Sequence, residues 1–161
     1  MKLFNVWQFL LVAAVFVPLE RFFALRKEQR ILRAKWRLDL VYTFVNGALI
    51  TVGIMLVVLV AGSAFSHVVP ERLRAAVASQ PLLIQYIEAV VTADLLFYAA
   101  HRLFHSVPFL WKFHAVHHSI EEMDWLASAR VHPFDQIVTK GASILPLLAF
   151  GFSGPVIAAH A

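Results

Sequence analysis

Residues 81–118 read PLLIQYIEAVVTADLLFYAAHRLFHSVPFLWKFHAVHH, an apolar run that leads into five closely spaced histidines. Over the first 20 of these residues, Pro81 to Ala100, Glu88 and Asp94 are the only formally charged side chains. Because about 20 apolar residues in a helix cross the roughly 30 Å hydrocarbon core of a bilayer, this run predicts a membrane span. The sequence therefore predicts a group of histidines where a spanning helix reaches the membrane surface.

The composition of the whole chain supports a membrane protein. Hydrophobic residues make up 60% and charged residues 15% of its 161 residues, whereas soluble domains have roughly 45–50% and about 25%. The chain contains no cysteine, which excludes disulfides, thiolate metal sites, iron–sulfur clusters and a cysteine nucleophile. The net charge of +4 fits the topology signal of a membrane protein, so we expect no nucleic acid partner.

Three further apolar blocks are long enough to cross a bilayer. They cover residues 3–25, residues 40–61 with a break expected at Gly62–Ser63, and residues 141–161. With the span over 81–100, these blocks predict an all-α, integral-membrane helical bundle of about four transmembrane helices. No linker or repeat divides the chain, so we expect a single membrane domain over residues 1–161.

The charges of the connecting loops predict an orientation. Residues 26–39 contain six Lys and Arg against two acidic residues, whereas residues 62–80 contain two Arg and one Glu. Short loops rich in Lys and Arg stay in the cytoplasm. We therefore expect a multi-pass protein with its N-terminus outside, and with residues 101–136 forming a histidine-rich cap at the cytoplasmic face.

The five histidines fall into two groups with helical spacing. The groups are His101 and His105, then His114, His117 and His118. Each spacing places its imidazoles on one face of a helix, and Pro108 between the groups suits a helix start. Neutral imidazole is a ligand for iron, zinc, copper and nickel, and a bound metal favours the neutral form. These five residues are therefore candidate ligands of one or more metal ions.

A polar stripe runs up the preceding helix toward the first group. Asp94, Tyr98, His101 and His105 follow one another in steps of 4, 3 and 4 residues. An ionisable group within a span usually faces the bundle interior. Asp94 is therefore a candidate to accept the second ring N–H of a ligating histidine, with Tyr98 beside it. The alternative for Asp94 is an ion pair with Arg102.

The stretch after the second histidine group is amphipathic. Its acidic residues Glu121, Glu122 and Asp124 are most simply explained as a face in contact with water. His132, which precedes Pro133, has three open interpretations: a further metal ligand, a residue that orients the site, or neither.

Together these residues form a pattern that resembles the fatty acid hydroxylase/sterol desaturase superfamily over residues 94–135. The pattern is Asp94-x-x-x-Tyr98-x-x-His101-Arg102-x-x-His105, then Leu110-Trp111-x-x-His114-x-x-His117-His118-Ser119, then Ser128-x-Arg130-x-His132-Pro133. The resemblance implies a membrane-bound di-iron oxygenase that uses O₂ and two electrons, supplied by an electron-donor protein, to hydroxylate or desaturate a C–H bond of a lipid in lipid biosynthesis. It implies that the five histidines hold iron, and zinc is an alternative because imidazole accepts both.

The chain departs from this family in one respect. Members have a further His-x-x-His-His box toward the C-terminus, which is absent before Ala161. We therefore interpret the chain as the N-terminal part of a longer protein, and expect no catalytic residues beyond the metal ligands. A non-catalytic metal-binding or haem-binding membrane protein, a metal transporter and a purely structural subunit are the alternatives. A zinc protease is disfavoured because His101 to His105 lacks the Glu of H-E-x-x-H.

Overall fold

A computed structural model describes residues 6–24, 26–66 and 68–160, which form helices joined by turns, with no strand in these ranges. The expected all-α class is therefore confirmed. The start of the first predicted span, residues 1–5, lies outside the described residues. The elements are α1 (Val6–Phe22), α2 (Trp36–Val41), the π-helix η1 (Tyr42–Asn46), α3 (Gly47–Ser66), α4 (Glu71–Ala78), α5 (Leu82–Ser106), α6 (Pro108–His114), the 3₁₀ turns η2 (His117–Ser119) and η3 (Ala127–Ala129), α7 (Pro133–Ala149) and α8 (Gly154–His160).

Two helical stretches of the described residues are long and apolar enough to cross a membrane. One is Trp36–Gly62, with 27 residues and a mean hydropathy of 2.5, and the other is Leu82–Ser106, with 25 residues and a mean hydropathy of 1.5. They correspond to the second and third predicted spans. The helices α1 and α7 have 17 residues each, shorter than the roughly 20 residues that cross a bilayer upright. Two of the four predicted spans thus meet the requirements of length and composition.

Two predicted boundaries were wrong. Helix α3 continues through Gly62–Ser63 to Ser66. The apolar block 141–161 is not one helix, because α7 ends at Ala149 and α8 begins at Gly154. Between them Gly151 has a φ of +78°, and a Cβ at this position would lie 3.2–3.5 Å from atoms of Arg74. Only glycine adopts this conformation without strain at such close approach, so the chain turns here.

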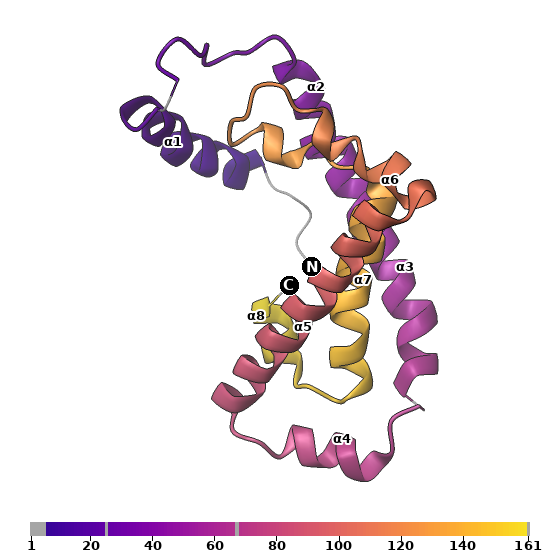
Figure 1. The fold of residues 1–161 in the computed structure, drawn as a ribbon. Coiled ribbons are helices and arrows are strands. Elements are labelled where there is room, and N and C mark those ends of the chain that lie inside the picture. Colours follow the sequence, from indigo (N-terminus) through magenta and orange to yellow (C-terminus); the bar gives the residue numbers. More distant parts are fainter. Residues whose placement is uncertain (1–5, 25, 67, 161) are drawn as a thin grey trace.

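The main body is a layer of three long helices, in which α7 packs against both α3 and α5 (Figure 1). Short α4 links α3 to α5 at one end, and α8 folds back against α5. Small residues let the helices approach closely, as is common inside membranes. Ala89 and Ala93 of α5 are buried with Leu147 of α7, and the Ser143 hydroxyl donates to the carbonyl of Ala93 at 3.1 Å.

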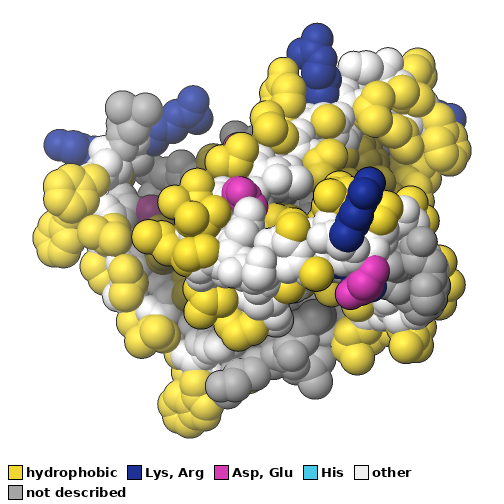
Figure 2. Space-filling view, turned by 90° about the horizontal axis from the view of Figure 1, so that it is seen from below, with side chains coloured by type: hydrophobic (Ala, Val, Ile, Leu, Met, Phe, Trp, Pro, Cys, Tyr) yellow, Lys and Arg dark blue, Asp and Glu magenta, His cyan; other side chains and the backbone are white. Residues whose placement is uncertain are grey.

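The outside of the body is apolar. Many large hydrophobic side chains are exposed, for example Leu59 (73%), Val60 (71%) and Leu83 (70%). Figure 2 shows that hydrophobic side chains dominate the face seen from the α4 end, with a few charged side chains between them. Such a surface suits contact with lipid rather than with water.

At the end of the molecule opposite α4, a buried arginine–aspartate network joins the basic loop (residues 26–39) to the stretch after the histidines (residues 120–132). Its members are Arg33, Asp39, Asp124 and Arg130. Arg33 donates to Asp39 and, at 2.7 Å, to Asp124, while Arg130 donates to Asp39 at 2.6 Å. The exposed fractions of Arg33, Asp39 and Arg130 are 3%, 0% and 2%. Although burial opposes it, Asp124 and Asp39 raise the pKa of Arg33 above its usual value.

This network corrects one prediction about the stretch after the histidines. Asp124 was expected on a face in contact with water, but one carboxylate oxygen accepts from Arg33 and the other accepts from the Ala127 N–H at 2.7 Å. Glu121 and Glu122 are exposed, as expected. The amphipathic pattern did not reveal Asp124 because its partner lies 91 residues away in sequence.

Candidate metal centre

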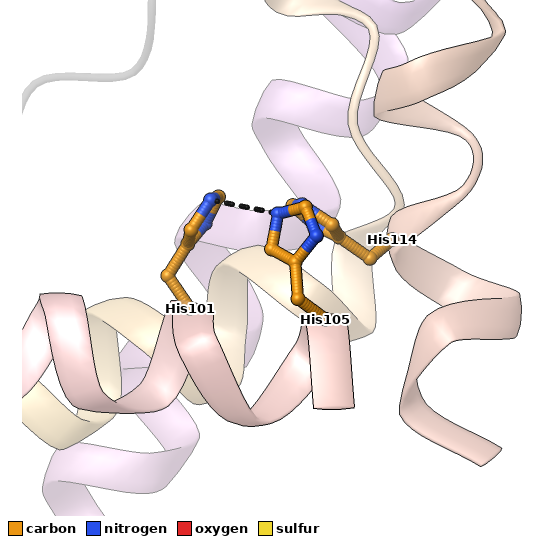
Figure 3. A group of neighbouring side chains, drawn as sticks. All are labelled: His101, His105 and His114. Atoms are coloured by element: carbon orange, nitrogen blue, oxygen red, sulfur yellow. Dashed lines mark hydrogen bonds between the residues drawn. The ribbon is translucent and has the colours of Figure 1, made fainter. Parts of the chain in front are cut away.

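The histidine groups are brought together by a sharp reversal between α5 and α6. His101 and His105 lie on the last two turns of α5. Val107 then adopts an extended conformation, φ −98° and ψ 116°, and Pro108 occupies the first turn of α6. Proline suits this position because it needs no hydrogen-bond acceptor for a backbone N–H. Helix α6 therefore turns back onto α5, and its last residue, His114, faces the histidines of α5 (Figure 3).

Four imidazole nitrogens form a continuous chain of contacts. The Nε2 atoms of His101 and His105 are 3.2 Å apart, those of His105 and His114 are 3.2 Å apart, and those of His114 and His118 are 3.2 Å apart. We call these four residues the histidine cluster. It unites both sequence motifs, since His101 and His105 come from the first and His114 and His118 from the second.

The spacing of these nitrogens suits a metal ion. Bonds of about 2.0–2.1 Å from an ion to two imidazole nitrogens put the nitrogens about 2.9 Å apart at a right angle and about 3.4 Å apart at a tetrahedral angle. The observed 3.2 Å lies between these values. The candidate ligand atoms of His101, His105 and His114 all lie within 4.8 Å of one another. The donor set therefore fits a transition-metal ion such as iron or zinc.

A carboxylate fixes the protonation of the central ring. The Nδ1 atom of His114 lies 2.6 Å from Asp135 Oδ2, and each residue is only 2% exposed. A carboxylate accepts, so the ring donates through Nδ1 and leaves the lone pair of Nε2 free for a metal. Asp135 lies in the first turn of α7, so this helix both supports the cluster and orients its central member.

The surroundings of His118 favour its neutral form. Burial lowers the pKa of His118, and the nearby rings of His114, His105 and His117 lower it further because a second positive charge among them is unfavourable. His118 is therefore uncharged at neutral pH, and an uncharged imidazole is the form that binds a metal.

The fifth predicted ligand, His117, lies beside the cluster but outside the chain of nitrogen contacts. Its ring centroid is 5.7 Å from that of His114 and 5.4 Å from that of His118. Its Nδ1 atom is buried and has no hydrogen-bond partner among the described residues. A buried nitrogen without a partner is unfavourable, and a ligand bound there would remove this cost.

His132 lies apart from the cluster. Its Nδ1 accepts from the backbone N–H of Phe134 at 3.1 Å, which caps the start of α7, and its ring packs on Phe113 with centroids 4.9 Å apart. When Nδ1 accepts, the proton of the neutral ring resides on Nε2. Of the three interpretations of His132, this geometry favours a residue that orients the site through α7.

No hydrogen bond or ion pair joins Asp94 or Tyr98 to the cluster among the described residues. Asp94 is exposed and lines a cavity of about 180 Å³ with Lys140 and His160. The Tyr98 hydroxyl accepts from Arg102 at 3.4 Å, so Arg102 is directed to Tyr98 rather than paired with Asp94. The carboxylate that bonds a candidate ligand is Asp135, which the sequence analysis missed. The available signal for Asp135 was its position just after the Arg-x-His-Pro motif, three residues beyond His132.

Comparisons with known proteins agree with the motifs. Residues 86–161 match the fatty acid hydroxylase family. A protein named ornithine lipid hydroxylase OlsE, from Rhizobium tropici, is 34% identical over 76 residues, which are 47% of this chain and 23% of that protein. The chain thus spans about a quarter of the length of this curated relative. No solved structure matches. The comparisons therefore support a relation between residues 86–161, which include the histidine cluster, and the fatty acid hydroxylase/sterol desaturase superfamily.

Proposed function

We propose that this chain provides part of the metal centre of a membrane-bound lipid hydroxylase that uses iron, O₂ and two electrons. The observation that carries the proposal is the chain of Nε2 atoms at 3.2 Å spacing, which joins both histidine motifs, with Asp135 behind His114. Iron is the expected metal because the family is one of hydroxylases, and a redox metal bound by imidazoles can supply O₂ chemistry that no side chain of this sequence provides alone.

The residues of the chain have separate tasks in this proposal. The four Nε2 atoms would hold the ion, and Asp135 would keep the proton of His114 on Nδ1 and the ring in place. The Trp111 ring lies beside two members of the cluster, with its centroid 5.5 Å from that of His105 and 5.2 Å from that of His118.

The position of the cluster suits a lipid substrate. It lies at the end of α5, one of the two helices that can cross a membrane, and many apolar side chains of α5 are exposed. A lipid would reach the site from the bilayer without entering water. The family and the relative are both named hydroxylases, so we favour hydroxylation over desaturation, and a polar acyl lipid over a sterol. The excess of Lys and Arg in residues 26–39 favours the cytoplasmic side for the cluster.

The main alternative is a membrane protein that binds a metal without catalysis. A haem protein is a weaker alternative, because haem takes its axial histidines from opposite sides of a flat ring. Here four Nε2 atoms follow one another at 3.2 Å, which suits a single ion.

Replacing His114 tests the proposal, because its Nε2 lies 3.2 Å from the Nε2 atoms of two members of the cluster. In the protein as its gene encodes it, purified from membranes that contain its electron donor, His114→Ala is expected to lower bound iron more than tenfold and to abolish the oxidised lipid product. His160→Ala, on α8, is the matched control and is expected to keep both. Mass spectrometry of the lipid distinguishes the gain of one oxygen from the loss of two hydrogens. Normal iron and product in His114→Ala would refute the proposal, and iron without any product would favour the non-catalytic alternative.

A further inference from the structure

A cavity among the described residues lies away from the histidine cluster. It measures about 350 Å³ and is formed by the C-terminal half of α1, by residues 24 and 26–31 before α2, and by the stretch over residues 121–124. Three arginines line it: Arg21, Arg26 and Arg30. The walls are joined by a hydrogen bond at 2.9 Å from the Gln29 side chain to the carbonyl of Met123.

Three carboxylates also line this cavity, but each is engaged elsewhere. Glu121 accepts from the Lys35 ammonium at 2.8 Å, which lowers the pKa of Glu121. Asp124 accepts from Arg33 at 2.7 Å as part of the buried network.

The third carboxylate belongs to α1. Glu20 accepts from the backbone N–H of Trp125 at 2.6 Å, and this bond holds α1 against the stretch after the histidines. A second contact supports the same placement, since the rings of Phe9 and Trp125 lie 5.3 Å apart. The carboxylates thus shape the cavity, and each already has a donor of its own.

The three arginines have no such partners. No hydrogen bond or ion pair of the Arg21, Arg26 or Arg30 side chain occurs within the described part of the chain. Arginine is charged at every physiological pH, and its planar guanidinium pairs with phosphate or carboxylate through two parallel hydrogen bonds. Three such groups around one cavity outnumber its one carboxylate without a cationic side-chain partner, that of Glu20, and leave the cavity with unmatched positive charge.

We infer that this cavity binds the phosphate of an anionic lipid headgroup. A lipid is favoured over a free oxyanion because the walls continue into apolar surface: Leu19 is 44%, Phe22 is 83% and Ile31 is 55% exposed. Acyl chains would cover these side chains while the headgroup occupies the cavity. Clusters of Lys and Arg next to apolar helices attract anionic lipids in this manner. The inference does not depend on the proposed hydroxylase activity, because it concerns a different part of the chain.

The test compares two variants that each lose three positive charges. The first is Arg21→Gln, Arg26→Gln and Arg30→Gln. The control is Lys27→Gln, Arg37→Gln and Arg72→Gln, whose residues do not line the cavity. Phosphatidylglycerol is titrated into the full chain in uncharged detergent micelles, and bound lipid is counted by native mass spectrometry. We expect the cavity variant to lose affinity more than tenfold and the control less than twofold. Equal affinity in the cavity variant and the natural protein, or an equal loss in the control, would overturn the inference.

Two further arms identify the ligand. Phosphatidylcholine is expected to bind at least tenfold more weakly than phosphatidylglycerol, because its headgroup carries no net charge. Inorganic phosphate is expected not to displace phosphatidylglycerol at equal concentration, and displacement would show that the site takes a free oxyanion and would overturn the assignment to a lipid. Circular dichroism checks folding. If the triple variant does not fold, each single substitution is expected to weaken binding about threefold, and three unchanged affinities would overturn the inference.

Discussion

The histidine cluster and the arginine–aspartate network are two polar groups at the same end of an apolar protein, but they are built in different ways. The cluster consists of imidazole rings separated by 4 to 9 residues in sequence. The network consists of charged groups, and its links Arg33–Asp124 and Arg130–Asp39 each join residues 91 apart. The cluster therefore follows from local helix geometry, whereas the network exists only once the chain has folded. The candidate metal ligands are thus brought together by neighbouring helices, whereas the network is formed by contacts between distant parts of the chain.

The two groups also differ in the free energy required to remove their polar atoms from water. Among the four imidazoles of the cluster only that of His114 is buried, whereas the network places two cations and a carboxylate at 3% exposure or less. Desolvation of buried charges offsets most of their attraction. We therefore expect the network to determine how the basic loop and the stretch after the histidines are arranged, and to be sensitive to the loss of a single partner.

Of the substitutions considered, removal of the Asp39 carboxylate should cause the largest loss of stability. Asp39→Ala leaves Arg33 and Arg130 buried without their shared carboxylate, although Arg33 keeps Asp124. Loss of one partner of a buried ion pair costs about 3–5 kcal/mol. Denaturant unfolding in detergent, followed by circular dichroism, should show a loss of stability of this size. The matched control is Glu122→Ala, an exposed carboxylate of the same end of the molecule, which should change the stability by less than about 0.5 kcal/mol.

A second variant tests whether the loss of stability comes from leaving charges buried without a partner. Replacing Arg33 and Arg130 by Met together with Asp39→Leu removes all three buried charges, and exchanges of this kind are often neutral or stabilising. If Asp39→Ala alone left the stability unchanged, the network would not be what holds this end of the protein together.

The histidine cluster should be weakened, but not unfolded, by a change behind it. Asp135→Asn keeps an acceptor near His114 Nδ1 but removes its negative charge. Loss of such a supporting carboxylate typically lowers metal affinity 10–100-fold, which is about 1.4–2.7 kcal/mol. Titration of the protein with Zn²⁺ or Fe²⁺ should show this decrease.

The control for this experiment is Asp94→Asn, because no hydrogen bond or ion pair joins Asp94 to the cluster among the described residues. Its metal affinity should equal that of the natural protein. A tenfold loss in Asp94→Asn with no loss in Asp135→Asn would restore the role that the sequence pattern gave to Asp94.

The difference between the two groups explains which parts the sequence could predict. Spacing of 4 residues puts His101 beside His105, and a proline after α5 reverses the chain, so local rules were enough to bring both motifs together. Asp94 was chosen as the supporting carboxylate because it shares a stripe with these histidines. A stripe says which residues share a face of one helix, but not which neighbouring helix covers that face. The neighbour is α7, and it contributes Asp135 instead.

The predicted membrane spans also show that sequence pattern alone does not reveal contacts between distant residues. Hydropathy located the apolar segments, and the two longest helices agree with it. It did not detect the turn at Gly151, because a break between α7 and α8 depends on one glycine that packs against Arg74 rather than on any polar residue. Similarly, Asp124 was expected to contact water as part of an amphipathic stretch, while its partner Arg33 lies in the loop before α2.

The smallest effect on stability is expected from a surface contact between the basic loop and the stretch after the histidines. Lys35 and Glu121 form an ion pair at 2.8 Å, with side chains 45% and 79% exposed. The hydrogen bond and charge of Lys35 lower the pKa of Glu121 below its usual 4.5. A carboxyl with a lowered pKa in the folded state stabilises the protein above its usual pKa, and this contribution is lost as the pH falls through the lowered value.

Glu121→Gln should therefore lower the unfolding midpoint slightly at pH 7, and the difference from the natural protein should vanish well below pH 4.5. Because both side chains are exposed, high salt should also remove the difference at pH 7. Comparing the two proteins at each pH cancels the titration of the histidines, which is common to both. A loss in Glu121→Gln as large as that in Asp39→Ala would show that the surface pair, and not the buried network, joins the basic loop to this stretch.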